Sequence, residues 1–236
     1  MITETKQKTM LAAPEGWGTA ELVQLINARV QPNRPLGEGD VFIRRMFLAS
    51  NRINSFGGRF DKKELAKMGE LAEGSPVLVG HNHQKLPIAR NFKADLVEKM
   101  EETWLAVHFY WLADSDGALN LLKNIDGGIY KEVSAAFLFE LPECSVCGRD
   151  IRICEHIPFR RYAVPNGSLA PAFFWYRNVT KLLETSLVYR GAVPGTKITV
   201  PLAGRSEQNQ ELFTTKTAER KNVPSRRKRL HPIYGR

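Results

Sequence analysis

Ser134 lies in a segment that predicts a strand, and its hydroxyl is a candidate nucleophile. Residues 131–140 read KEVSAAFLFE, in which one alternating set is apolar: Val133, Ala135, Phe137 and Phe139. This period of two is typical of a strand with a buried face, and it places Ser134 on the opposite face with Ala136 and Leu138. Because those neighbours are also apolar, we expect both faces to be covered. The serine is then either filler in a packed sheet or a nucleophile with room for a substrate.

His81 is a candidate general base for such a nucleophile. It follows a short apolar strand, residues 77–79, and Gly80, so that its imidazole emerges where the chain leaves the sheet. His83 stands two residues later and competes for the same role. The alternative for both is an exposed loop histidine without a chemical function.

Glu184 is the candidate third member of the group. It lies within the apolar segment LLETSLV at residues 182–188. Burying a carboxylate there costs on the order of several kcal/mol unless it is paired or hydrogen-bonded. It therefore either faces solvent or orients an imidazole. Ser134, His81 and Glu184 would supply nucleophile, base and orienter, in a chain order unlike that of chymotrypsin, subtilisin or the α/β-hydrolases. Geometry, and not chain order, defines a triad.

The cysteines indicate a separate metal site, since all three lie within eleven residues. Cys144-x-x-Cys147 followed by a glycine has the shape of a metal knuckle, and Cys154-x-His156 follows after six residues. These four ligands predict tetrahedral Zn²⁺ in an insertion at residues 142–160. A closed four-ligand site leaves no open position, so we expect structural zinc. The alternatives are a reduced thiol cluster or a redox pair.

Composition is that of an ordinary globular protein, and the positive charge is concentrated at one end. The 236 residues are 43% hydrophobic and 25% charged, with a net charge of +9. From residue 205 onward, nine Lys and Arg stand against three Glu, a net charge of +6, which leaves +3 for the rest. Such a tail is typical of a disordered, solvated segment with weak nucleic-acid contact. No apolar run has transmembrane length and the first residues lack a signal-peptide pattern, so we expect a cytoplasmic protein without membrane contact.

Periodicity and turn residues predict an α+β or barrel-like fold. We expect an N-terminal arm over residues 1–38, a main domain over 39–200 and a basic tail over 201–236. The expected helices cover residues 19–30, the segment after an Asp61 cap with a capping-box Glu64, and residues 115–125. The expected strands are 40–50, 77–79, 91–97, 104–111, 131–140 and 179–190.

Three blocks resemble the signature blocks of the tailed-phage prohead (capsid maturation) serine proteases, a family related to the herpesvirus assemblins. They are PVLVGHNHQKLPIAR at 76–90, KEVSAAF at 131–137 and LLETSLVYRGAVPGTKI at 182–198. The corresponding family blocks are an apolar strand ending in histidine before a Pro-Ile pair, a Ser-small-small-Phe strand, and a Glu-x-Ser-Leu-Val strand with a downstream proline. The resemblance spans about residues 40–200 and keeps the order and approximate spacing of the blocks.

This resemblance implies roles for the candidate residues. Ser134 matches the family nucleophile, His81 its general base, and Glu184 the third member, which is a histidine in assemblins. The chain departs from the family where Ala135-Ala136 replaces the frequent Ile-Gly pair, and where His83 adds a second histidine.

The family fold is a small β-barrel surrounded by helices. The implied activity is that of a serine endopeptidase that needs no cofactor for its chemistry and cleaves major capsid protein and scaffold protein precursors. It would act as a homodimer inside the phage procapsid, in the host cytoplasm. Two rivals remain: a zinc-stabilised nucleic-acid-binding protein, which the knuckle and basic tail favour, and a catalytically inactive capsid-assembly or scaffold protein of the same fold.

Overall fold

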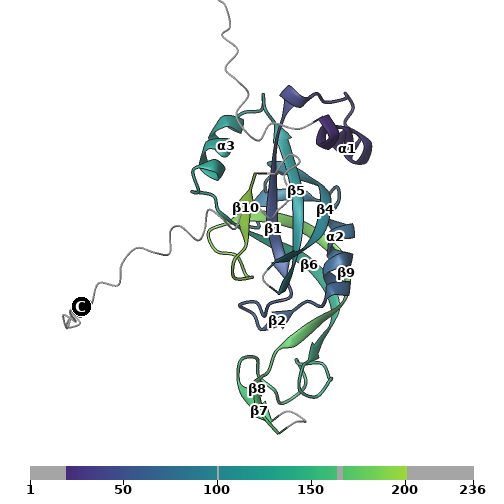
Figure 1. The fold of residues 1–236 in the computed structure, drawn as a ribbon, viewed down its shortest axis with the longest axis vertical. Coiled ribbons are helices and arrows are strands. Elements are labelled where there is room, and N and C mark those ends of the chain that lie inside the picture. Colours follow the sequence, from purple (N-terminus) through teal and green to yellow (C-terminus); the bar gives the residue numbers. More distant parts are fainter. Residues whose placement is uncertain (1–19, 100, 164–166, 201–236) are drawn as a thin grey trace, which may run out of the picture. The chain divides into compact units, whose positions relative to one another are not determined.

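The computed structural model describes residues 20–99, 101–163 and 167–200, all within one compact unit (Figure 1). The predicted tail, residues 201–236, and the first 19 residues of the predicted arm lie outside the described residues. The elements follow in the order α1 (Ala20–Val30), η1 (Glu38–Asp40), β1 (Val41–Ser50), β2 (Gly58–Arg59), α2 (Lys62–Ala72), β3 (Pro76–Val79), β4 (Ala89–Lys99), β5 (Glu102–Leu112), α3 (Ala118–Asp126), β6 (Glu132–Cys144), β7 (Arg161–Ala163), β8 (Leu169–Pro171), β9 (Phe174–Val188) and β10 (Lys197–Thr199).

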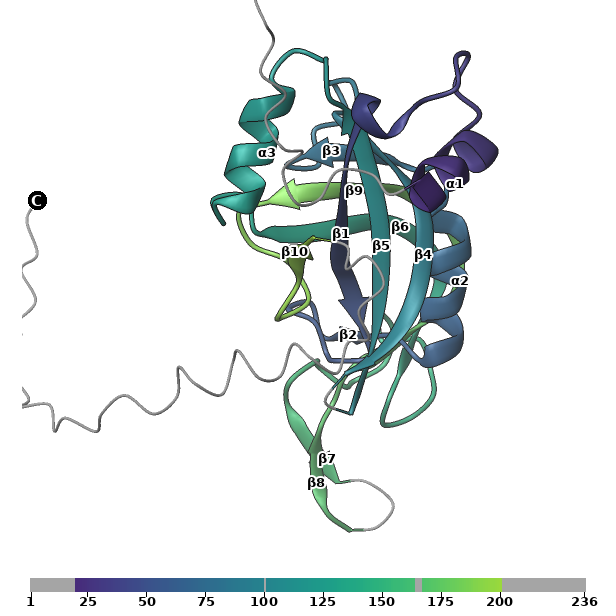
Figure 2. The same cartoon turned by 45° about the horizontal axis from the view of Figure 1, so that its top comes forward.

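One sheet dominates the fold, and it curls into a half-barrel (Figure 2). Its order is β10-β1-β5-β4-β3-β9-β2, and β6 pairs with β9 outside this path. The pairs are antiparallel except for β3 with β9 and β2 with β9, which are parallel. Ile198 N–H donates to the Lys131 carbonyl oxygen at 3.1 Å, which holds β10 beside the start of β6. The α+β class is thus confirmed, with three α-helices in the described part of the chain.

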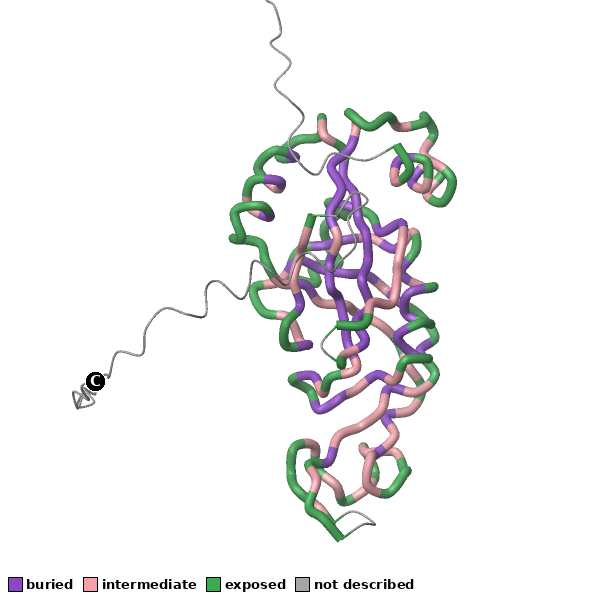
Figure 3. Tube along the Cα trace, in the orientation of Figure 1, coloured by how far each residue is buried: buried purple, intermediate pink, exposed green. Residues whose placement is uncertain are grey.

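The main core fills the inside of the curl (Figure 3). Leu65 and Met68 of α2 are fully buried there, together with Leu105 of β5. A second cluster lies between α1 and the other face of the sheet, where Ile26 packs with Ile43. The apolar face of α1 therefore packs against apolar side chains that β1 presents on this face of the sheet.

The three α-helices lie where the sequence predicted them, but the N-termini of α2 and α3 each differ from the prediction in one detail. Asp61 caps α2, since its carboxylate accepts a 2.8 Å bond from Glu64 N–H. The Glu64 carboxylate does not return this bond and instead accepts from the backbone N–H groups of Asn178 and Val179, which ties α2 to β9. Helix α3 begins three residues later than predicted, because Ser115 Oγ bonds backward to the Leu112 carbonyl and forms a turn.

Strand β9 is longer than predicted. It starts at Phe174, whereas the apolar pattern indicated a start near residue 179. Two register shifts in its pairing with β6 interrupt the alternation of the sequence. Such bulges bend a strand and interrupt the alternation of buried and exposed residues. The alternating pattern therefore did not predict the first residues of β9.

Candidate active site and candidate metal centre

Strand β9 places Glu184 on the same side of the sheet as Ser134. In the antiparallel pairing of β6 with β9, Ser134 is opposite Ser186 and Ala136 is opposite Glu184. Directly opposite residues share a face, with Cβ atoms about 4.5–5.5 Å apart. Ser134, Ser186 and Glu184 therefore lie on one face, away from the core that Val133 enters.

A tight turn after β3 brings His81 to this face. Gly80 and His81 both have left-handed backbone conformations, with φ of +63° and +56°. For the non-glycine residue this conformation costs about 1–2 kcal/mol. Two bonds to β9 hold the turn: Gly80 N–H donates to the Leu187 carbonyl at 2.8 Å, and His81 N–H donates to Ser186 Oγ at 3.0 Å. The chain is thereby bent so that the imidazole reaches Glu184.

His81 and Glu184 form a close pair. The imidazole Nδ1 lies 2.5 Å from Glu184 Oε1. Glu184 is only 1% exposed. The carboxylate is therefore buried and does not face solvent, which was the other alternative that the sequence allowed. Its other oxygen, Oε2, accepts a 2.6 Å bond from Ser186 Oγ. Buried carboxylates persist when both oxygens are satisfied in this way.

His83 is farther from the carboxylate. Its Nε2 lies 4.0 Å from Glu184 Oε1, beyond hydrogen-bond distance, and its side chain is 56% exposed. The His81 side chain is 38% exposed. With Nδ1 held by the carboxylate, His81 keeps Nε2 for a second partner, and this geometry favours His81 over His83 as a base.

Ser134 lies near this pair without a bond to it. Within the described residues, its hydroxyl makes no hydrogen bond with His81 or with any other group. The expected covering of both faces is wrong here: Ser134 is partly exposed and Leu138 is 49% exposed. The core packs only against the Val133 side of β6, so the Ser134 side remains accessible.

Ser186 is a residue of the site that the sequence reasoning missed. Its fully buried hydroxyl links the His81 backbone to the Glu184 carboxylate. The available signal was the Glu-x-Ser spacing, because residues two apart on a strand share a face. On the opposite face, Asn91 donates to Thr185 Oγ1 at 3.0 Å and to Ser75 Oγ at 2.9 Å, so that β9 is bonded from both sides.

The four predicted metal ligands come together. The donor atoms of Cys144, Cys147, Cys154 and His156 all lie within 4.8 Å of one another. In tetrahedral zinc with Zn–S bonds of about 2.3 Å, ligand atoms are separated by roughly 3.8 Å, so the cluster is of the right size. The His156 Nδ1 atom is buried and has no hydrogen-bond partner in the described structure. An imidazole nitrogen and three sulfurs form a donor set that fits zinc.

The local backbone supports thiolate chemistry in the cluster. Val146 N–H points to Cys144 Sγ at 3.4 Å, and Gly148 takes a left-handed φ of +70° that turns the knuckle. A hydrogen bond from the Arg149 backbone is the main cause that lowers the pKa of the Cys147 thiol to about 6. Burial raises the pKa of Cys154. A metal ion would hold such thiols deprotonated.

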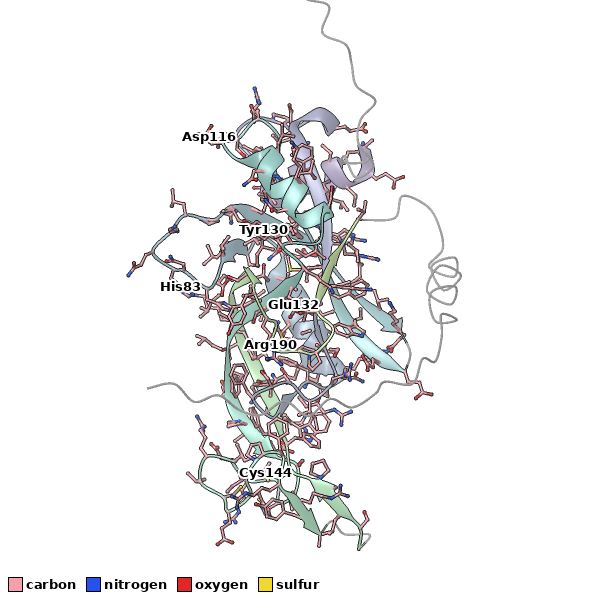
Figure 4. The ribbon with its side chains drawn as sticks, turned by 90° about the vertical axis from the view of Figure 1, so that its left-hand side faces the viewer. His83, Asp116, Tyr130, Glu132, Cys144 and Arg190 are labelled. Atoms are coloured by element: carbon pink, nitrogen blue, oxygen red, sulfur yellow. The ribbon has the colours of Figure 1, made fainter. Side chains whose placement is uncertain are left out.

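The cluster is remote from Ser134. Cys144 is ten positions after Ser134 on β6, which corresponds to roughly 33 Å of fully extended strand. Figure 4 shows Cys144 at the far end of the long β6–β9 pair from Glu132 and Arg190. The four-residue cluster is therefore too far from Ser134 to contact it.

Comparison with protein-family models, with curated proteins and with solved structures finds no match for this chain. In the part of the chain that the structure describes, no helix is long and apolar enough to cross a membrane.

Proposed function

We propose that the chain is a serine endopeptidase of the prohead-protease type, with Ser134 as nucleophile, His81 as general base and Glu184 as orienting carboxylate. The observation that carries the proposal is the 2.5 Å contact between His81 Nδ1 and the buried Glu184 carboxylate. Two polar residues 103 positions apart in the sequence meet on the strand face that also carries Ser134. The pairing of a buried carboxylate with a partly exposed imidazole leaves the second ring nitrogen of His81 available for another partner, as a general base requires.

The reaction would be acyl transfer to Ser134. His81 Nε2 would take the proton from Ser134 Oγ as the oxygen attacks a peptide carbonyl, and would then pass it to the leaving amine. Glu184 would fix the tautomer of His81 and stabilise its charged form. Backbone N–H groups would stabilise the oxyanion, so that no cofactor is needed for the chemistry. The present gap between Ser134 and His81 would close on substrate binding, since catalytic hydrogen bonds are often loose without substrate.

The resemblance of the three blocks supports a role in phage head maturation. In this role the protein would act as a homodimer of assemblin-like fold inside the procapsid and cleave major capsid protein and scaffold precursors. The curled half-barrel of the sheet and the accessible Ser134 face are compatible with such an enzyme.

We also propose that the cysteine cluster binds one structural Zn²⁺. Cys144, Cys147, Cys154 and His156 would bind it as a closed tetrahedral set. The ion would brace the insertion between β6 and β9, in whose described residues the short β7–β8 hairpin is the main regular structure.

The test is co-expression with a capsid-protein precursor. We expect processing by the wild type and none by Ser134→Ala, while Ser115→Ala, a matched change at an exposed turn, should process normally. Processing that survives Ser134→Ala would overturn the protease assignment.

A second candidate is a catalytically inactive capsid-assembly protein of the same fold. It is favoured by one observation, the lack of a hydrogen bond from Ser134 to His81 within the described residues. Absence of processing by the wild type, combined with normal head assembly that fails without the protein, would support this candidate.

A further inference from the structure

An apolar groove lies between α3 and the connection from β3 to β4, on the side of the half-barrel where Figure 2 shows α3 and β3. Its volume is about 930 Å³, which is within the range of about 300–1,000 Å³ that is typical of ligand-binding sites. One wall comes from Val79 and residues 86–90. The other wall comes from the end of β5, the first residues of α3 and Tyr130.

Large apolar side chains of this groove are open to solvent. Leu86 is 88% exposed and Val79 is 52% exposed. Ile88, Leu112 and Tyr130 are each between 37% and 42% exposed. Soluble proteins rarely leave several large apolar side chains together on the surface unless a ligand or partner covers them. The groove is therefore suited to a ligand that buries apolar surface.

The charges of the groove do not favour a polyanion. The charged residues that line it are two arginines and three aspartates: Arg34, Arg90, Asp40, Asp114 and Asp116. Nucleic acid and anionic membrane surfaces bind where positive charge is in excess. A polypeptide segment with apolar side chains and little charge is the class of ligand that fits an apolar groove of nearly balanced charge.

Both walls of the groove lead along the chain to a candidate catalytic residue. Val79 is two positions before His81, and the chain returns to the groove at residue 86, so the connection that carries His81 forms one wall. Tyr130, on the other wall, is four positions before Ser134. Four positions correspond to no more than about 13 Å of extended chain. About four residues of an extended peptide would therefore span the distance from Tyr130 to Ser134.

We propose that this groove binds apolar side chains of the polypeptide substrate, within about four residues of the peptide bond that is cleaved. The inference rests on the proposed protease function, which makes the bound peptide a substrate. An extended peptide turns alternate side chains to the same side, so that every second residue of the bound segment enters the groove. The groove thereby selects substrates that have apolar residues at alternate positions beside the cleaved bond.

The test measures binding of a fluorescein-labelled peptide of eight residues, in which leucine alternates with serine, by fluorescence anisotropy. The full-length chain carries Ser134→Ala, so that it does not cleave the peptide. A second peptide has asparagine in place of each leucine and the same charge. Each leucine side chain that leaves water on binding contributes about tenfold or more in affinity. We therefore expect the leucine peptide to bind at least about tenfold more tightly than the asparagine peptide.

Two double variants of this chain locate the binding. Leu86→Asp/Leu112→Asp changes both walls of the groove at exposed positions, and it should weaken binding of the leucine peptide about tenfold or more. The matched control is Leu119→Asp/Leu169→Asp, which adds the same charge at residues that are 58% and 57% exposed and do not line the groove. The control should bind the peptide as the parent chain does. Circular dichroism of each variant verifies that it is folded.

Equal affinities for the two peptides, or equal losses in the two double variants, would overturn the proposal. Failure of the leucine peptide to bind would also overturn it. If sedimentation velocity then showed a dimer that only Leu86→Asp/Leu112→Asp dissociates, the groove would be a contact between two copies of the chain. Failure of the protease function gives a different result: the leucine peptide binds in the groove, but a fluorophosphonate, which bonds covalently to activated serines, does not label Ser134 of the wild type. That result would support the groove as an apolar-peptide site and contradict the protease assignment alone.

Discussion

Ser186→Ala is the change that most sharply probes how the site is held together. Ser186 Oγ accepts the His81 N–H bond at 3.0 Å and donates the 2.6 Å bond to Glu184 Oε2. Ser186 is fully buried and Glu184 is 1% exposed, so water cannot easily replace the hydroxyl. The substitution therefore leaves a buried carboxylate oxygen without its donor and a strained turn without its anchor.

The cost can be worked from these contacts. A hydrogen bond to a charged group contributes about 1.5–3 kcal/mol, and a neutral one contributes about 0.5–1.5 kcal/mol. Because the left-handed His81 conformation relaxes when its anchor is lost, the two terms do not add fully. We expect the free energy of unfolding to fall by about 2–4 kcal/mol.

The assay is equilibrium unfolding in urea, with zinc present throughout. Ser115→Ala is the control, since its hydroxyl is exposed and its loss should change the free energy of unfolding by no more than about 0.5–1 kcal/mol. A change in Ser186→Ala no larger than that of the control would refute the bridging role. The same variant should process substrate at a reduced rate, because His81 is no longer held over Glu184.

Three further predictions follow from other contacts. His81→Asn should abolish processing whereas His83→Asn should retain most of it, because only His81 is within bonding distance of the carboxylate; equal losses in a processing assay would contradict this. Metal analysis should find one zinc ion per wild-type chain and little in Cys144→Ser, with a lower Tm for that variant; unchanged zinc would contradict the Cys3His site. Burial, aided by the Lys93 charge, lowers the pKa of His108 to about 4, below its ordinary value of 6.5, so the unfolded chain takes up the proton first. The contribution of neutral His108 to the free energy of unfolding should thus be fully present above about pH 6.5 and fall by roughly 3 kcal/mol as the pH drops toward 4. His108→Gln should flatten this part of the dependence of the free energy of unfolding on pH, measured by urea unfolding. A pH dependence in His108→Gln equal to that of the wild type would contradict this prediction.

The local patterns were readable from the sequence because their causes are local. The spacing of Cys144, Cys147, Cys154 and His156 predicted a four-ligand cluster, and the structure brings these donors together. Knuckle geometry depends on a short loop, which the sequence determines directly. The apolar run before Gly80 likewise predicted β3 and the exit of the chain toward His81.

The long-range features were not readable because they depend on register. Nothing in the sequence alone states that β9 lies between β3 and β6, or that Ser134 faces Ser186. A shift by one residue would turn Glu184 into the core and away from His81. The bridging role of Ser186 depends on such pairings.

The most direct test of the central claim is labelling with a fluorophosphonate, which forms a covalent bond with activated serines. The purified wild-type protein should be labelled, peptide mass spectrometry should place the label on Ser134, and both Ser134→Ala and His81→Asn should lose it. Ser115→Ala should be labelled like the wild type. A wild-type protein that is not labelled, or a label that remains in Ser134→Ala, would contradict the account of Ser134 as a nucleophile activated by His81 and Glu184.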